Sequence, residues 1–236
     1  MAIIYGYADT EKRLLDKLPK EIQSIDEIDK VHREFKDEFD SIEDKGLKNK
    51  FRRWSKKRQI NKIENNKNSS LHSGAKGELR VLDTLSRLDD DYHVLCGITM
   101  ELNHYVTYRE RKNLKSAQMD FVVVSKRGII LIEVKNWTDT YVFKNRENGG
   151  LEPHEQVERA GRVLWICLKD WFAPKNPNVT SVLLTIQGNM KYDPTYKFVA
   201  VKDLITINQW IQKRKEEFSD KEVERIVNRL KSHVTK

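Results

Sequence analysis

Two short apolar runs joined by a polar turn constrain the fold of this chain more than any other segment. Gln118–Ser125 and Gly128–Lys135 are rich in Val and Ile, and only Lys126 and Arg127 separate them. Apolar runs of this length that flank a short turn ending in Gly predict two antiparallel strands. The chain is therefore expected to contain a β-hairpin at this position.

The register of this hairpin determines which polar side chains meet. If Ser125 pairs with Gly128, then Asp120 lies opposite Glu133, with about 5 Å between the two Cβ atoms. If the turn shifts by one residue, Asp120 lies opposite Lys135 instead. Glu133 and Lys135 are two residues apart and therefore share one face of their strand. Either register brings two carboxylates and one ammonium group together at the end of the hairpin.

These three polar groups in an apolar hairpin are suited to phosphodiester cleavage. Two close carboxylates repel each other and offer hard oxygen ligands, which favours the binding of Mg²⁺ or Mn²⁺. Such a metal ion polarises the phosphate and activates water, while Lys135 orients that water or stabilises charge on the phosphate. The alternative interpretation is an ordinary cross-strand ion pair at a solvated strand edge.

A helix that is predicted to open near Gly74 offers a third carboxylate. Leucines recur in it at three-residue steps, which indicates a helix with one buried face. They are Leu79, Leu82, Leu85 and Leu88. Gly74 and Gly77 each destabilise a helix by about 1 kcal/mol relative to Ala, so we expect them to permit close approach of the backbone to a neighbour. Glu78 projects from the same side as Gly74, one turn later.

The order of several short motifs is more specific than any one of them. Gly77-Glu78 is followed by Gln118-Met119-Asp120, then by Gly128, and then by Ile132-Glu133-Val134-Lys135-Asn136-Trp137. Together these motifs resemble the nuclease-related domain (NERD) family of the PD-(D/E)xK nuclease superfamily, over roughly residues 71–204. The resemblance implies an α/β fold with a restriction-endonuclease-like core, in which helices flank a mixed central sheet.

The resemblance also implies roles for individual residues. Glu78, Asp120 and Glu133 correspond to metal ligands for Mg²⁺ or Mn²⁺. Lys135 corresponds to the residue that positions the attacking water. All four are therefore candidate catalytic residues.

Gln156 resembles the glutamine that opens the following helix in this family, with a role in catalysis or in contacting DNA. Its alternative role is local capping of that helix. The chain departs from the family pattern at two places. It has Thr138-Asp139 where members usually carry Gly, and Ala160 where an aromatic residue often follows the glutamine by one turn.

Positive charge is concentrated before the nuclease-like segment. The net charge of +8 suits an anionic partner such as nucleic acid. Residues 45–67 hold 10 Lys or Arg against Glu64 alone, whereas residues 1–44 hold 7 Lys or Arg and 13 Asp or Glu. The candidate contacts to nucleic acid are Lys50, Arg52, Arg53, Lys56, Lys57 and Arg58.

Phe51 and Trp54 interrupt this basic stretch and lie three residues apart, on one face of a helix. The basic stretch is thus a candidate phosphate-binding arm. One alternative is a helix that packs both aromatic side chains on the core and exposes its charges. Another is an acidic first region that folds back onto the basic one.

We expect two domains. Residues 1–68 form a charged, helical N-terminal extension with the basic arm at 45–67, and residues 69–236 form a nuclease-like α/β domain with C-terminal helices. In the extension, helices are predicted at Asp9–Leu18 and Ile22–Phe39, and Asn61–Ser70 is the expected linker. Their apolar stripe must cover the chain's own domain or a second copy, which would make a homo-oligomer through the N-terminal helices.

In the α/β domain, Tyr92–Met100 is predicted to be a strand that leads into an irregular loop at Glu101–Ser116. Aromatic and basic side chains of that loop are candidates for stacking on bases or holding phosphates; they are Tyr105, Tyr108, Arg109, Arg111 and Lys112. Later elements are a helix at Gln156–Phe172, strands at Val179–Ile186 and Phe198–Val201, a helix at Leu204–Phe218, and a final helix after the capping box Ser219-Asp220-Lys221-Glu222.

Other chemistries are disfavoured. Cys96 and Cys167 are too far apart in sequence for a disulfide framework or a zinc site, so a cytoplasmic location is expected. The apolar stretches are far shorter than the roughly 20 residues that cross a bilayer, so no membrane partner is expected. The six histidines show no ligand spacing.

The sequence therefore favours a Mg²⁺-dependent DNA nuclease, most simply an endonuclease, in DNA processing or in defence against foreign DNA. RNA is not excluded as a substrate. The rival interpretation is a catalytically weak or inactive module that binds nucleic acid or oligomerises beside a helicase or another defence protein.

Overall fold

The computed structural model describes residues 1–137, 152–174, 176–187 and 190–235. They form two compact units, one of Met1–Ala8 with Gly77–Lys236 and one of Asp9–Lys76. The expected domains remain a prediction, but this division places the first eight residues with the α/β unit and extends the helical unit to Lys76.

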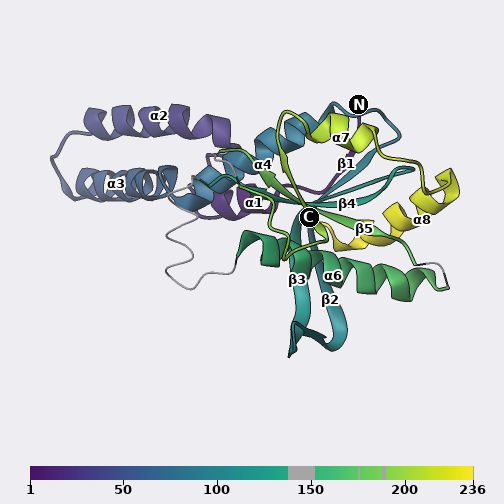
Figure 1. Cartoon of the computed structure of the whole chain (residues 1–236). Coiled ribbons are helices and arrows are strands. Elements are labelled where there is room, and N and C mark those ends of the chain that lie inside the picture. Colours follow the sequence, from purple (N-terminus) through teal and green to yellow (C-terminus); the bar gives the residue numbers. More distant parts are fainter. Residues whose placement is uncertain (138–151, 175, 188–189, 236) are drawn as a thin grey trace. The chain divides into compact units, whose positions relative to one another are not determined.

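The α/β unit is built on one six-stranded sheet in the order β1-β2-β3-β4-β5-β6 (Figure 1). The strands are β1 (Ile3–Tyr5), β2 (His93–Tyr108), β3 (Arg111–Ser125), β4 (Gly128–Lys135), β5 (Val179–Thr185) and β6 (Val199–Asp203). β2, β3 and β4 pair antiparallel, whereas β1, β5 and β6 join in parallel. The sheet is therefore mixed and flanked by helices, and the predicted α/β fold class is confirmed.

Helices cover both faces of this sheet (Figure 1). α6 (Pro153–Phe172) and α8 (Asp220–Leu230) pack on one face, in a core that includes Val122 and Leu131. α7 (Ile207–Gln212) and the part of α4 (Ser70–Ser86) that follows Gly77 pack on the other face, in a second core that includes Phe121 and Ile132. Because side chains alternate along a strand, each of β3 and β4 supplies both cores.

The first of the two predicted hairpin registers is the one observed. Ser125 pairs with Gly128, and the ladder continues to the pair Phe121 and Ile132. Gly128 has φ of 123°, a conformation that glycine adopts without strain. The turn residues therefore set the register that the sequence predicted.

The expected irregular loop at Glu101–Ser116 is wrong. β2 and β3 continue as a paired ribbon to Tyr108 and Arg111, with register shifts near Val106. The ribbon forms because Leu102 and Leu114 are buried, with polar residues facing solvent between them. Because the exposed positions of the ribbon carry charged and polar side chains, its alternation of buried and exposed residues is not apparent from the sequence.

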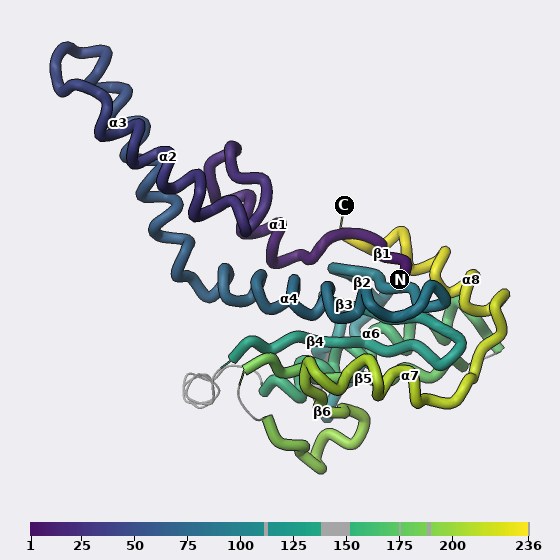
Figure 2. The backbone as a smooth tube through the Cα atoms, turned by 90° about the horizontal axis from the view of Figure 1, so that it is seen from above, coloured from purple at the N-terminus to yellow at the C-terminus, as the bar shows by residue number. Residues whose placement is uncertain are grey.

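The helical unit holds α1 (Asp9–Leu15), the 3₁₀ turn η1 (Ile25–Glu27), α2 (Ile28–Ser41) and α3 (Leu47–Lys67). α2 and α3 lie side by side as an antiparallel pair (Figures 1 and 2). Ion pairs join them between Lys56 Nζ and Glu38 at 2.6 Å and between Lys36 Nζ and Glu64 at 2.9 Å. The acidic region thus folds back onto the basic one, as one of the alternatives expected.

The predicted linker at Asn61–Ser70 is also wrong. α3 continues to Lys67, and α4 begins at Ser70. The polar composition is misleading because Ile63 is fully buried and Glu64 pairs with α2, so this part of α3 is held by tertiary contacts.

At the C-terminal end, the predicted helix Leu204–Phe218 is reduced to α7, and the chain then runs without regular structure to α8. The predicted capping box is present at the start of α8, where the backbone N–H of Ser219 donates to Glu222 Oε2 at 2.8 Å. A short 3₁₀ turn, η2 (Lys231–His233), follows α8. Within the described residues, no helix combines the length and apolarity that crossing a bilayer requires.

Candidate active site

The candidate site lies where the two central strands separate. The β3–β4 ladder ends at Phe121 and Ile132, after which β4 stays paired with β5 and β3 with β2. Asp120 and Glu133 are the first residues past this fork, one on each strand. The predicted pairing of Asp120 with Glu133 would be the next step of this register, but the ladder ends one pair before it.

The side chain of Asp120 bridges the fork. Its Oδ2 accepts a hydrogen bond of 2.7 Å from the backbone N–H of Val134. The carboxylate thus satisfies a backbone N–H group that would otherwise donate to a carbonyl of a neighbouring strand. This bond fixes Asp120 beside the β4 segment that carries Glu133 and Lys135.

The sheet is kinked at the level of Asp120. Gly97, between the pairs Cys96–Phe121 and Ile98–Met119, has φ of 58°. Cys96 and Phe121 lie in one core, whereas Ile98 and Met119 lie in the other, although a regular strand would keep residues two apart on one face. Asp120 therefore occupies the point at which the faces of both strands exchange. The sequence signal was an isolated Gly inside a predicted strand.

Lys135 and Glu133 form an ion pair at the end of β4, with Nζ 2.9 Å from Oε1. Both side chains are largely buried. Burial alone lowers the pKa of Lys135, but the carboxylates of Glu133, Asp120 and Glu78 outweigh it and hold that pKa above its ordinary value. The ammonium group is therefore charged throughout the neutral range.

The surroundings of Asp120, in contrast to those of Lys135, disfavour its charged form. Removal from solvent raises its pKa well above the ordinary range, and the carboxylates of Glu133 and Glu78 raise it further. Lys135 and the N–H of Val134 oppose the shift without cancelling it. The cluster therefore carries more negative charge than its own lysine compensates, which is the electrostatic setting of a divalent cation site.

Glu78 approaches this cluster from α4. Its side chain is 5% exposed, and its negative charge acts on Asp120 and on the buried Cys96, whose pKa is raised to about 12 mainly by desolvation. Gly77 makes the approach of α4 close, because a Cβ there would lie 2.9 Å from Asn136 Cβ and 3.0 Å from Ile186 Cδ1. The close contact expected of Gly77 is therefore observed.

Gln156 lies in the first turn of α6, half-buried. α6 covers the sheet face that Glu133 and Lys135 share, because Ile132 and Val134 belong to the core on the opposite face. The assignment of Gln156 to catalysis or to DNA contact stays a prediction.

The chemistry of the donors suits Mg²⁺ or Mn²⁺, since carboxylate oxygens are the hard ligands that these ions prefer. As placed, no three His, Cys, Asp or Glu side chains in the described part of the chain are gathered closely enough to enclose a metal ion. The ligand assignment of Glu78, Asp120 and Glu133 accordingly remains a prediction.

The six basic residues predicted to bind nucleic acid divide into two groups. Arg53 donates to the carbonyl of Ile42 at 2.7 Å, and Lys56 pairs with Glu38, so both are used within the helical pair. Four others remain exposed on α3; they are Lys50, Arg52, Lys57 and Arg58.

The candidate contacts of the β2–β3 ribbon are also partly used inside the chain. Tyr108 Oη donates to Glu158 at 2.5 Å, and Arg109 pairs with the same carboxylate at 3.3 Å. Tyr105 is exposed. The side chains of Arg111 and Lys112 lie outside the described residues.

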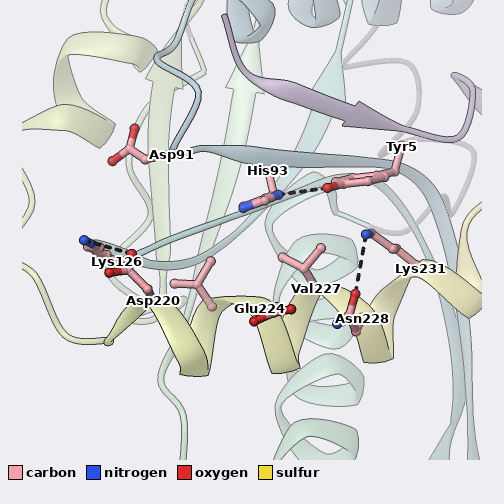
Figure 3. Close-up of a pocket in the computed structure, with 10 residues that line it drawn as sticks. Tyr5, Asp91, His93, Lys126, Asp220, Glu224, Val227, Asn228 and Lys231 are labelled. Atoms are coloured by element: carbon pink, nitrogen blue, oxygen red, sulfur yellow. Dashed lines mark hydrogen bonds and ion pairs between the residues drawn. The ribbon is translucent and has the colours of Figure 1, made fainter.

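A second cluster of titratable groups, which the sequence did not predict, lines a cavity of about 340 Å³ at the turn end of the β3–β4 hairpin (Figure 3). Tyr5 Oη and His93 Nδ1 share a hydrogen bond of 3.0 Å, and Lys126 pairs with Asp220 at 2.8 Å. The first contact joins β1 to β2, and the second joins the β3–β4 turn to α8. Both contacts are formed between residues far apart in sequence, so no local sequence pattern predicts them.

His93 should make the stability of the fold depend on pH. Burial, aided by the charge of Lys231, lowers its pKa below the ordinary value despite Asp91. The unfolded chain then binds a proton more readily, so stability is complete above the unfolded pKa of about 6.5 and is lost as pH falls through the folded value. Urea midpoints at pH 7.5 and 5.5 should differ less in His93→Gln than in wild type. An equal effect of replacing the exposed His104 would contradict this origin.

A mixed sheet flanked by helices, with Asp120 and Glu133 where two central strands separate, places this unit in the α/β class. Residues 73–185 match the family model described as the nuclease-related domain, NERD. The chain therefore carries a nuclease-related domain, which confirms the resemblance and implies a nuclease-related function. Neither a curated protein nor a solved structure matches the chain.

Proposed function

We propose that the chain is a metal-dependent DNA endonuclease whose centre is the fork between β3 and β4. The observation that carries the proposal is the electrostatic coupling of Asp120 to both Glu133 and Glu78, with the ammonium of Lys135 2.9 Å from Glu133. Charges from three segments thus act on one another there, beside one lysine. An isolated surface ion pair needs no such convergence.

Each residue then has a distinct task. Glu78, Asp120 and Glu133 would hold Mg²⁺ or Mn²⁺, which supplies Lewis acidity at the phosphate and a lower pKa for water. The N–H of Val134 fixes the orientation of Asp120. Lys135, kept charged by its neighbours, orients the water or stabilises negative charge on the phosphate. Gln156 would contact the substrate from α6.

Metal dependence is the direct test of this function. Supercoiled plasmid should be nicked by the full chain in Mg²⁺ or Mn²⁺ and remain intact in EDTA, because the proposed metal activates the water. Loss of the supercoiled band on a gel measures the reaction, and labelled RNA in parallel tests the choice of nucleic acid. Lys135→Ala should reduce nicking, whereas Asp90→Asn, at an exposed acid outside the site, should not.

The second candidate is a nucleic-acid-binding module. It is favoured by the exposed basic residues of α3 and by the lack of a compact three-ligand group among the described residues. DNA retention without cleavage in any divalent metal would support it over the endonuclease. DNA processing or defence as the setting, with a helicase or other defence protein as partner, remains a prediction.

A further inference from the structure

The first half of α3 exposes a row of large apolar side chains. Leu47, Phe51 and Trp54 are 88%, 67% and 58% exposed, and their spacing of four and three places them on one helical face. The rings of Phe51 and Trp54 lie together, with centroids 5.8 Å apart. An exposed apolar cluster of this kind marks an interaction surface. We call these three residues and the surrounding cations the α3 platform.

The α3 platform is not the face by which α3 packs on α2. Contacts to α2 are made by Arg53 and Lys56, whose cationic groups lie over the rings of Phe39 and Phe35. Farther along α3, Ile60 and Ile63 are buried. The expectation that Phe51 and Trp54 pack on the core is therefore wrong for the helical unit. This unit has its own core without them.

Cations surround the apolar row. Arg58 lies 5.8 Å from the Trp54 ring centroid. Four further cations are exposed and make no hydrogen bond or ion pair with any described residue; they are Lys48, Lys50, Arg52 and Lys57. The platform thus combines aromatic faces with several uncompensated positive charges.

This combination selects among partners. A second copy docked platform to platform would bring like charges together, which is unfavourable. An anionic membrane would need a wide apolar face, whereas this row is one residue wide and bordered by charge. A nucleic-acid strand offers phosphates for the cations and base faces for the rings. In a duplex those base faces are already stacked, so only an unpaired strand offers both.

We infer that the α3 platform binds single-stranded nucleic acid by stacking bases on Phe51 and Trp54 while the surrounding Lys and Arg hold phosphates. The inference rests on the proposed function only for the choice of nucleic acid as the polymer. It assigns to the helical unit a preference for single-stranded regions.

Binding in EDTA tests the platform without cleavage. Fluorescence anisotropy of the full chain with a labelled oligo-dT should show tighter binding than with a hairpin duplex of equal phosphate number. Phe51→Ala and Trp54→Ala should each weaken oligo-dT binding about tenfold and change duplex binding little. Tyr192→Ala, at an equally exposed aromatic residue of the other unit, is the matched control and should have no effect.

Charge variants separate stacking from simple attraction. The double variant Lys50→Ala with Lys57→Ala should bind both oligo-dT and the duplex more weakly. The salt dependence of its binding should fall by the equivalent of about two phosphate contacts. Circular dichroism checks that each variant keeps its helices. Oligo-dT binding is measured in EDTA and nicking in Mg²⁺, so a failed nuclease and a failed platform give different results.

Several outcomes would overturn the inference. Equal affinity for duplex and oligo-dT would refute the single-strand preference, as would unchanged oligo-dT binding in the double variant that combines Phe51→Ala with Trp54→Ala. Light scattering that shows a dimer of wild type and a monomer of that variant would assign the platform to self-association. Binding to phosphatidylserine vesicles without binding to oligo-dT would assign it to a membrane.

Discussion

Asp120→Asn should abolish metal-dependent nicking while making the metal-free protein more stable. The amide can still accept the N–H of Val134, but it brings no negative charge to the metal. Removing one charged group that acts on the transition state reduces rate by at least about 100-fold. Plasmid nicking by equal amounts of wild type and variant measures this loss. If Asp120→Asn nicked plasmid as fast as wild type, the assignment of Asp120 to the active site would be wrong.

The gain in stability has a defined sign. Burial and the carboxylates of Glu133 and Glu78 raise the pKa of Asp120, so its ionised form destabilises the folded state at neutral pH. The penalty disappears as pH falls through the folded pKa toward the unfolded value of about 3.9. The melting temperature of Asp120→Asn in EDTA should therefore exceed that of wild type at pH 7.5, and the difference should shrink as pH falls. Saturating Mg²⁺ should stabilise wild type only.

Gly97→Ala should strongly destabilise the α/β unit. The residue has φ of 58°, and an added Cβ would meet Thr235 Oγ1 at 2.5 Å and the backbone oxygen of Tyr7 at 2.9 Å. Left-handed strain and overpacking together destabilise by about 3 kcal/mol. Urea unfolding followed by circular dichroism measures the loss.

Gly46→Ala separates the two causes. Gly46 has φ of 81°, but a Cβ there meets nothing within 4 Å. The free energy of unfolding of Gly46→Ala should therefore fall only by the smaller part that comes from backbone strain. Equal losses at the two glycines would show that the contacts around Gly97 do not matter. Nicking by Gly97→Ala should also fall, because the kink positions Asp120.

The hairpin and its polar residues could be predicted because turn chemistry fixes register over a few residues. Once Ser125 and Gly128 are paired, every later partner follows as far as Phe121 and Ile132. The helix carrying Glu78 could be predicted from leucine periodicity, and the contact of Gly77 from its identity. These features depend on local sequence.

The features that escaped prediction depend on distant partners. β1 is three residues long and is defined by pairing with β2, some ninety residues later in the chain. α3 continues through a polar segment because Ile63 is buried and Glu64 pairs with Lys36 of α2. The kink at Gly97 requires Thr235 and Tyr7 from opposite ends of the chain. Local propensity carries no information about such contacts.

The two strands at the margins of the sheet limit how copies of this chain can join. β1 has three residues and β6 has five, and β6 ends in Lys202 and Asp203. Short, charged outer strands are poor templates for adding a strand from another molecule. Addition of a strand from another molecule at β1 or β6 is thereby discouraged.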